Sequence, residues 1–199
     1  MKNIAVFASG NGSNFQAIID AVQGGKLDAS IKLLVCDREN AYAIERAQKA
    51  GIPQFVFSAK DYSGKEDYEK EILVRLKESG VEFVILAGYM RLIGSVLLSD
   101  FAGKIINIHP SLLPAFPGKD AVGQALNAGV KISGVTIHFV DAGMDTGPII
   151  AQQAVEVSED DTRESLQEKI QKIEHELYPY ILQKLFTAKE EKQWVKNVH

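Results

Sequence analysis

The sequence predicts a single-domain α/β fold: a mostly parallel, Rossmann-like twisted sheet with helices on both faces, completed by a C-terminal antiparallel strand pair and a long helix. Two observations lead to this fold class. Short apolar runs alternate with helix-spaced patterns from residue 4 to residue 108, which implies crossover connections and a parallel sheet covered on both faces. After Pro114, two longer runs are joined by a short glycine-containing loop, which favours antiparallel pairing.

Five short strands are predicted in the first half of the chain. Their nearly continuous apolar runs are typical of strands buried on both faces. The runs occupy residues 4–8, 31–36, 54–57, 83–87 and 104–108. Apolar residues at helical spacing predict helices over about residues 15–22, 41–50 and 68–76. Each helical pattern is followed by a glycine: Gly24, Gly51 or Gly80. Asn40 is expected to cap the second helix.

A second block of elements is predicted after Pro114. A helix is expected over residues 120–128, and long strands over residues 132–140 and 148–157 are expected to pair antiparallel at one end of the sheet. Asp161, with Glu164 three residues later, resembles a capping box. It predicts the start of a long helix.

The long helix is defined by one apolar stripe: Leu166, Ile170, Ile173 and Leu177. Pro179 is expected to kink it, because proline lacks a backbone N–H and its ring crowds the preceding turn. The polar tail after Ala188 is expected to be peripheral. No linker long enough to divide the chain is present, so we expect one domain over residues 1–199.

Composition and charge exclude several classes of protein. The 199 residues, 46% hydrophobic and 24% charged, suit a globular domain. A net charge of −4 argues against broad nucleic-acid binding, which depends on clustered cations. The single cysteine, Cys36, excludes an internal disulfide and a thiolate metal cluster. No apolar stretch approaches a membrane span or a signal-peptide core, so we expect a cytoplasmic protein without a membrane partner.

An amide and an imidazole stand two residues apart at the end of the fifth predicted strand. Asn107 and His109 project to the same side, because side chains alternate along a strand. The segment Pro110–Pro114 cannot continue the strand pairing, so the pair lies at a carboxyl end, where open α/β sheets bind ligands. An amide that holds an oxyanion beside a histidine that moves protons is typical of acyl transfer. Two hydrogen-bonded structural residues are the alternative.

Residues 9–14, Ser-Gly-Asn-Gly-Ser-Asn, form a glycine-rich loop between the first predicted strand and the first helix. Glycines allow close backbone approach, and the free N–H groups of a helix start favour an anion. Phe15 stands where the dinucleotide fingerprint needs a third glycine, and the Gly-Lys-Ser/Thr of a Walker loop is absent. The loop therefore favours a phosphate monoester held by backbone and by Ser13 and Asn14. A capped turn without a ligand is the alternative.

Two acidic residues follow predicted strands. Asp145, in the loop of residues 141–148, is the candidate partner of His109, because a nearby carboxylate favours and orients an imidazolium. A loop aspartate is also an ordinary turn former. Asp37 stands where a dehydrogenase binds ribose, but a solvated strand-end carboxylate is the preferred interpretation. His138 alternates with apolar neighbours and is interpreted as structural, and His175 is given no functional role.

Three segments together resemble one family. Asn-Ile-His-Pro-Ser-Leu-Leu-Pro at 107–114, Gly-Asn-Gly-Ser-Asn at 10–14 and Asp-Thr-Gly-Pro at 145–148 resemble the formyltransferases that use 10-formyltetrahydrofolate. The resemblance extends over nearly the whole chain. The phosphate loop, together with residues 87–91 and 174–179, narrows the resemblance to the members that formylate phosphoribosylglycinamide in purine biosynthesis.

The resemblance implies a role for each of several residues. Its catalytic residues are Asn107, His109 and Asp145. The residues that the resemblance assigns to binding of the ribotide substrate are Gly12, Ser13, Asn14, Phe15, Gln16 and Glu174. The residues that it assigns to binding of the co-substrate 10-formyltetrahydrofolate are Lys65, Met90, Arg91, Leu92, Ile93, Asp141 and Met144. Many relatives carry Arg at position 65, and Lys is a point charge that cannot bind a carboxylate through two parallel hydrogen bonds. No metal is implied.

The resemblance also divides the single domain into functional parts. Residues 1–100 form a phosphate-binding half, residues 101–188 a catalytic and folate-binding half, and residues 189–199 the peripheral tail. The implied partners are small-molecule substrates, and a homodimer is compatible with the sequence. Four rivals are weighed: a formyl-folate hydrolase, a methionyl-tRNA formyltransferase, a nicotinamide-dependent oxidoreductase and a non-catalytic nucleotide-binding module. The first two usually carry a further domain, and the missing third glycine counts against the oxidoreductase.

Overall fold

The computed structural model describes residues 1–188, so the tail expected at 189–199 lies outside the described residues. The strands are β1 Lys2–Ala8, β2 Ala29–Cys36, β3 Gln54–Val56, β4 Phe83–Leu86, β5 Ile105–His109, β6 Ile132–Phe139 and β7 Ile149–Glu156. The helices are α1 Ser13–Gln23, α2 Tyr42–Lys49, the 3-10 turn η1 Ala59–Asp61, α3 Lys65–Glu78, α4 Ser95–Asp100, α5 Ala121–Asn127 and α6 Arg163–Thr187.

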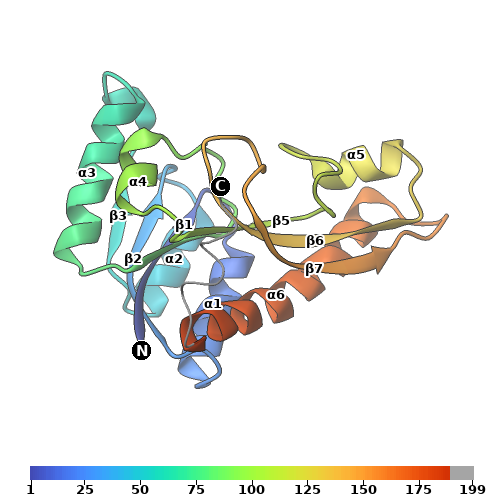
Figure 1. Cartoon of the computed structure of the whole chain (residues 1–199), viewed down its shortest axis with the longest axis horizontal. Helices are drawn as coiled ribbons and strands as arrows, with labels where there is room; N and C mark the ends of the chain where they lie inside the picture. The colour runs from blue at the N-terminus through green and yellow to red at the C-terminus, as the bar shows by residue number, and fades with distance from the viewer. Residues whose placement is uncertain (189–199) are drawn as a thin grey trace.

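All seven strands form one sheet in the order β3-β2-β1-β4-β5-β6-β7 (Figure 1). The pairs from β3 to β5 are parallel, whereas β6 pairs antiparallel with both β5 and β7. The predicted fold class is thereby confirmed, including the antiparallel pair at one end of the sheet. The order reverses direction at β1 and β4, where parallel sheets open a crevice outside the strand ends.

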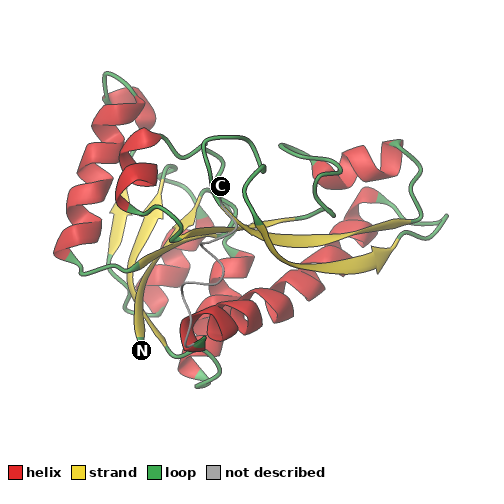
Figure 2. Cartoon of the chain, viewed as in Figure 1, coloured by secondary structure: helices red, strands yellow, loops and turns green. Residues whose placement is uncertain are grey.

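Helices cover both faces of the sheet (Figure 2). On one face, α1, α2 and α6 bury residues such as Phe15, Ala43 and Ile170 in one core. On the other face, α3 and α4 bury residues such as Ile72 and Leu97 in a second core. A sheet buried on both sides explains why its strands are continuous apolar runs instead of alternating patterns.

Two short elements were not predicted, and one cap was wrong. Helix α4, of six residues, and the turn η1 are too brief to display a helical period. Asn40 does not cap α2, because the helix begins at Tyr42 and its N-cap is Ala41, without a side-chain hydrogen bond. The chain is extended at Ala41, one residue later than expected.

The start of α6 also differs from the predicted capping box. Thr162 is the N-cap, and its hydroxyl accepts a hydrogen bond from the backbone N–H of Ser165 at 3.2 Å. The hydroxyl of Ser165 accepts from the Thr162 N–H in return at 3.0 Å. Asp161 lies outside the helix and accepts from the Ser158 N–H instead. The helix then runs through Pro179 without interruption.

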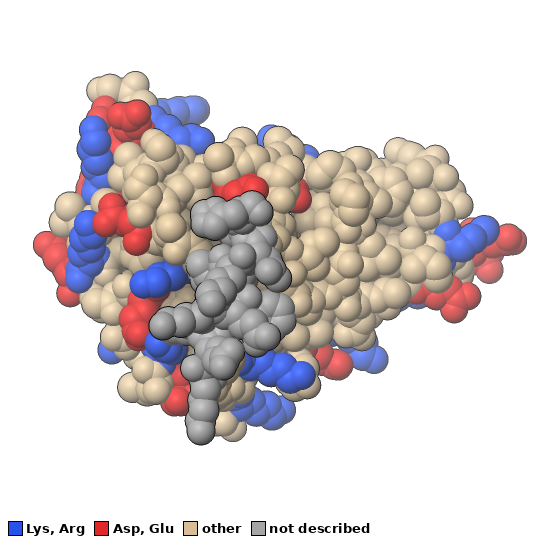
Figure 3. Space-filling view, in the orientation of Figure 1, with Lys and Arg blue, Asp and Glu red and all other residues tan. Residues whose placement is uncertain are grey.

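The surface in view carries mixed charges. Lys and Arg lie among Asp and Glu over α3, whereas the region over β6, β7 and α5 is mostly uncharged (Figure 3). A broad basic face, the usual footprint of nucleic-acid binding, is not displayed on this side of the described residues. None of the helices within residues 1–188 combines the length and the apolar character needed to cross a bilayer.

Tyr178 fastens α6 to the middle of the sheet. Its fully buried hydroxyl lies 2.9 Å from the carbonyl oxygen of Leu86 and 3.0 Å from that of Ile106. These carbonyls belong to β4 and β5, directly beside the strand position of Asn107. The single hydroxyl hydrogen therefore serves two buried acceptors at the point where the parallel strands end.

We expect Tyr178→Phe to lower the free energy of unfolding by about 1–3 kcal/mol, because it leaves buried carbonyl oxygens without a donor. Urea unfolding at neutral pH measures the change. The matched control is Tyr180→Phe, two residues along the same helix and exposed, which should stay within about 0.5 kcal/mol of the wild type. Equal effects of both substitutions would contradict this account of Tyr178.

Candidate active site

Antiparallel pairing places three polar side chains together at β5. Asn107 faces His138 across the β5–β6 pair, and His109 lies two residues further along the same strand. The Asn107 amide nitrogen lies 3.1 Å from Nε2 of His138. His109 and His138 are almost completely buried, whereas Asn107 is half-buried. The amide and the imidazole predicted to project together do so.

His109 stands between two hydrogen-bond acceptors. Its Nε2 lies 2.8 Å from the carbonyl oxygen of Phe116, and its Nδ1 lies 3.4 Å from Oδ2 of Asp145. Neither oxygen can donate a hydrogen bond. An acceptor oxygen therefore faces each nitrogen of the His109 ring. The structure thus brings Asp145 to the histidine with which the sequence paired it.

His138 has the opposite environment. Its Nδ1 lies 2.7 Å from the carbonyl oxygen of Phe139, which fixes the hydrogen on Nδ1 and leaves Nε2 as an acceptor for the Asn107 amide. Burial lowers its pKa below the ordinary value, although the charge of Asp145, 3.7 Å from Nε2, opposes this shift. A neutral His138 therefore orients the Asn107 amide, a contact that the sequence did not predict.

The loop between β6 and β7 holds Asp145 in a specific backbone conformation. Oδ1 of Asp141 accepts hydrogen bonds from the Gly143 N–H at 3.0 Å and the Thr146 hydroxyl at 2.7 Å, which closes the loop. Asp145 has a left-handed backbone with φ 56°, which is uncommon for a residue other than glycine. Its Oδ2 also accepts the Gly118 N–H at 2.7 Å. The carboxylate is therefore preorganised from two loops.

The predicted phosphate loop lies at the same edge of the sheet, between β1 and α1. Gly12, the N-cap of α1, is left-handed with φ 73°. A Cβ added there would lie 2.9 Å from the Cβ of Ala43, so the loop lies directly against α2. Ser13 and Asn14 open the helix, where backbone N–H groups are free to bind an anion. Phe15 is completely buried, and the amide of Gln16 contacts Asp20 and Arg46.

Glu174 of α6 lies beside this loop. The amide nitrogen of Asn14 donates to Oε2 of Glu174 at 3.0 Å. Burial raises the pKa of Glu174 to about 7, and the hydrogen bond from Asn14 lowers it in part. A buried carboxylate with one donor has acceptor capacity to spare, which suits recognition of ligand hydroxyl groups.

The segment expected to bind folate follows β4. Met90 and Leu92 are exposed, whereas Ile93 is buried in the second core. The Met90 N–H donates to the Ser9 hydroxyl at 2.9 Å. Met144 is also exposed, and its sulfur lies close to Gly118. Apolar side chains exposed around a polar site are typical of a surface that binds an aromatic ligand.

Arg91, which belongs to this segment, has its charge paired with a protein carboxylate. Its Nε lies 2.7 Å from Oδ2 of Asp37, a carboxylate that is buried. The interpretation of Asp37 as a solvated strand-end residue is therefore wrong, because Arg91 from a neighbouring loop covers it. The ion pair ties the loop after β2 to the loop after β4.

Lys65, the first residue of α3, lies at the far end of this segment. A Cβ added to Gly94 would lie 2.7 Å from Cδ of Lys65. The adjacent Glu69 is buried and accepts the Gly94 N–H at 2.6 Å. The exposed Lys65 side chain thus lies against Gly94, the residue that follows this segment. Residues 1–188 contain no group of three or more His, Cys, Asp or Glu side chains that could hold a metal ion.

A family model described as formyl transferase matches residues 2–182. The chain belongs to the formyltransferase family. It is 57% identical over 185 residues to phosphoribosylglycinamide formyltransferase of Bacillus subtilis (strain 168), covering 93% of this chain and 95% of that protein. It is 37% identical over 180 residues to the enzyme of the same name from Escherichia coli (strain K12), covering 90% and 85%.

Solved structures agree with this family. Phosphoribosylglycinamide formyltransferase from Bacillus halodurans matches with a TM-score of 0.92 and 52% identity, covering 97% of this chain and 99% of that one. Glycinamide ribonucleotide transformylase 1 from Geobacillus kaustophilus matches with a TM-score of 0.91 and 59% identity, covering 93% and 98%. The fold of this formyltransferase is therefore shared over nearly its full described length.

Three contacts at the formyltransferase site escaped sequence reasoning. They are the orienting bond from His138, the Phe116 carbonyl on His109, and Arg46 beside the phosphate loop. Only His138 carried a signal, since it alternates with apolar residues in a strand predicted to end near the loop of Asp145. The other two depend on which loops become neighbours.

We expect Glu174→Gln to remove a pH-dependent loss of stability. Since the folded pKa is about 7 and an unfolded glutamate titrates near about 4.3, the folded wild type binds more protons between these values. Its stability therefore falls as pH rises through this window. The variant should match the wild type near pH 4 and exceed it by on the order of 3 kcal/mol at pH 8.

Urea unfolding at pH 4, 6 and 8 measures this difference. Glu176→Gln, at an exposed position two residues along α6, is the control and should show no such trend. A constant difference between Glu174→Gln and the wild type at all three pH values would show that the buried carboxyl is ionised throughout.

Proposed function

We propose that the protein transfers a formyl group from 10-formyltetrahydrofolate to the amine of 5-phosphoribosylglycinamide, which gives formylglycinamide ribonucleotide and tetrahydrofolate in purine biosynthesis. One contact carries this proposal: Oδ2 of Asp145 lies 3.4 Å from Nδ1 of His109, on the strand that presents Asn107. The phosphate loop opens at the same edge of the sheet. The near full-length likeness to the Bacillus subtilis enzyme supports it further.

In this proposal the ribotide occupies the edge formed by β1, α1 and α6. The backbone at Gly12, Ser13 and Asn14 holds the phosphate, with Phe15 and Gln16 alongside. The carboxylate of Glu174 accepts hydrogen bonds from the ribose hydroxyls. Since Asn14 already contacts Glu174 at 3.0 Å, one side chain links the two subsites and fixes their spacing.

The folate is expected between the segment after β4 and the loop after β6. When bound, 10-formyltetrahydrofolate supplies the activated formyl group. Exposed Met90, Leu92 and Met144 offer apolar contacts to its rings, and Asp141 holds the loop closed. Lys65 provides a cation for the carboxylates of the folate's glutamate tail. Ile93 and the Asp37-bound Arg91 keep this segment in place.

Asn107 and His109 stabilise the negative charge that develops on the formyl oxygen as the amine nitrogen attacks the formyl carbon. One N–H of the Asn107 amide points to His138, so the other remains for the oxygen. Before it can bind the formyl oxygen, Nε2 of His109 has to break its hydrogen bond to the Phe116 carbonyl oxygen. A developing oxyanion accepts a hydrogen bond more strongly than a neutral carbonyl, which favours this exchange.

Proton movements complete the transfer. The attacking amine loses one proton, the bond between the formyl carbon and the folate nitrogen breaks, and that nitrogen gains a proton. His109 or a bound water carries the proton, while Asp145 keeps the imidazolium oriented and compensated. Much of the acceleration is expected from holding two substrates in register.

The proposal extends to the setting of the enzyme. We place it in the cytoplasm, acting as a single domain on small-molecule substrates without nucleic acid or a membrane. The phosphate-binding half spans residues 1–100 and the catalytic and folate-binding half residues 101–188. A homodimer is compatible with the sequence, and sedimentation in solution tests it.

Asp145→Asn should reduce kcat by about 100-fold or more while KM for both substrates stays within about threefold. The charge that compensates the imidazolium is lost, whereas the phosphate and folate contacts remain. Steady-state kinetics between pH 6 and 9 measure the effect. Glu159→Gln, a highly exposed acid in the turn after β7, is the control. An unchanged kcat across this pH range would disprove the partnership with His109.

An acceptor assay tests the function itself. With 10-formyltetrahydrofolate as donor, we expect formylated product with phosphoribosylglycinamide and none with initiator tRNA, because no basic nucleic-acid footprint was predicted from the composition. Release of formate in water alone should be slower than transfer by several orders of magnitude. Formate release at the same rate with and without ribotide would identify a hydrolase instead.

A further inference from the structure

Helix α2 packs directly against the phosphate loop. The Ala43 N–H donates to the carbonyl of Gly10 at 3.1 Å, and the Ala43 methyl group lies where a side chain at position 12 would project. The loop conformation is therefore set by α2 as well as by α1. This helix contains none of the residues that the family resemblance assigns to the substrate.

Arg46, one turn further along α2, binds this loop through three hydrogen bonds. Nε donates to the Asn11 carbonyl at 2.8 Å, and Nη2 donates to the Asn11 side chain at 2.9 Å. Nη1 donates to Oε1 of Gln16 at 2.9 Å. A guanidinium has five N–H donors, so two remain for another acceptor. The planar group joins the start of the loop to the first turn of α1.

The positive charge of Arg46 is not neutralised by these contacts. All three acceptors are uncharged, and within residues 1–188 the guanidinium forms no ion pair with a carboxylate. Arg75, Arg91 and Arg163 each pair with an acid instead. An uncompensated cation beside an anion site is unusual if its role is only to fasten a loop.

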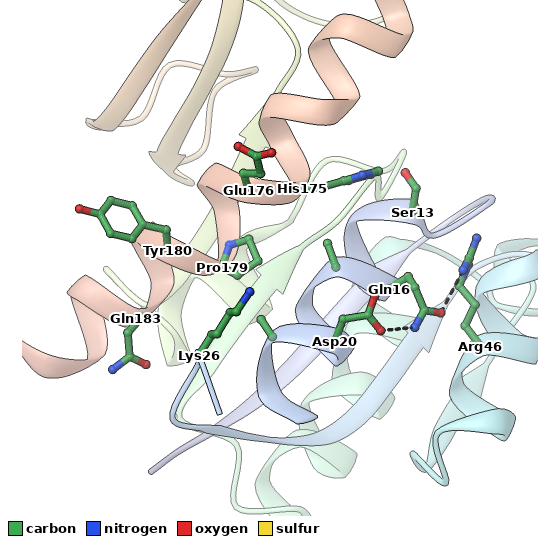
Figure 4. A pocket seen from close by; sticks show the side chains of 12 residues that line it. Ser13, Gln16, Asp20, Lys26, Arg46, His175, Glu176, Pro179, Tyr180 and Gln183 are labelled. Carbon is green, nitrogen blue, oxygen red and sulfur yellow. Dashed lines mark hydrogen bonds between the residues drawn. The ribbon is translucent and has the colours of Figure 1, made fainter. Parts of the chain in front are cut away.

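A cavity of about 780 Å³ lies beside Arg46 and the first turn of α1. Ser13, Gln16 and His175 line it together with Arg46, between α1 and α6 (Figure 4). Nε2 of His175 is buried without a hydrogen-bond partner among the described residues. Burial lowers the pKa of His175, and the charge of Arg46 lowers it further. The charge of Arg46 therefore acts on His175 across this cavity, whose lining also includes Lys26, Asp20 and Glu176.

We propose that Arg46 is a positioning residue that also supplies the positive charge by which the site prefers a phosphate ester to an uncharged sugar. The inference rests on the proposed function, because that function places the phosphate at residues 12–16. Those five residues are all uncharged, and Glu174 beside them is acidic. A phosphate monoester carries about −1.5 to −2 charges at neutral pH, and Arg46 is a cation held against this loop by hydrogen bonds to Asn11 and Gln16.

Binding of two probes tests this role without catalysis. Ribose 5-phosphate and ribose are titrated into the wild type, Arg46→Gln, Arg46→Lys and the control Lys49→Gln. Lys49 is an exposed cation on the same helix, and like Arg46 it lies over the Tyr42 ring. We expect Arg46→Gln to weaken ribose 5-phosphate binding about tenfold or more while ribose binding stays within twofold. Arg46→Lys should retain most of the phosphate preference, and Lys49→Gln all of it.

Other outcomes would overturn the inference. Equal losses for both probes in Arg46→Gln indicate a purely structural role, and unchanged binding of both indicates none. If Arg46→Gln lacks a cooperative thermal transition, Arg46→Lys carries the test, and loss of the phosphate preference despite the retained charge contradicts the proposal.

Kinetics separate this inference from the proposed function. With phosphoribosylglycinamide, Arg46→Gln should raise KM for the ribotide about tenfold, with kcat and the folate KM within twofold. A wild type that formylates no ribotide refutes the proposed function, and the ribose 5-phosphate titration still decides the role of Arg46.

Discussion

The antiparallel pairing of β6 with β5 is the constraint on which the candidate site depends. It aligns Asn107 with His138 and brings the end of β6 beside Ile105, at the amino end of β5. The following loop therefore folds back to reach His109. This return allows one carboxylate to approach two imidazoles, His109 at 3.4 Å and His138 at 3.7 Å. A parallel β6 would run in the opposite direction, and its loop would leave the sheet elsewhere.

Burial then determines which groups of the site carry charge. Desolvation disfavours the charged form of any isolated group. It lowers the pKa of His138 and raises that of Glu174, so both tend toward neutrality near pH 7. His109 has a different set of neighbours, because an acceptor oxygen faces each of its ring nitrogens. Two histidines on neighbouring strands thus have different surroundings: Nε2 of His138 accepts from the Asn107 amide, whereas His109 lies between two acceptor oxygens.

The sequence predicted the elements better than their contacts. Strands buried on both faces leave continuous apolar runs, and spacing along β5 was enough to pair Asn107 with His109. By contrast, α4 is shorter than two helical turns and leaves no periodic signal. The ion pair of Asp37 with Arg91 joins loops that are 54 residues apart in the chain, and the Phe116 carbonyl reaches His109 only because the irregular segment after β5 folds back over it. Such contacts are set by tertiary packing, which no local pattern encodes.

Phe15 explains why the first loop suits a single phosphate ester. In dinucleotide-binding folds a third glycine lets the helix approach the strand closely. Here the ring of Phe15 fills that space and is completely buried in the core beneath α1. Phe15 thus stands in place of the third glycine, on which close packing of helix and strand depends in dinucleotide-binding folds. Gly12 still forms the left-handed turn that presents the backbone N–H groups. The start of α1 keeps its free backbone N–H groups, and Glu174 of α6 lies beside them through its hydrogen bond from Asn14.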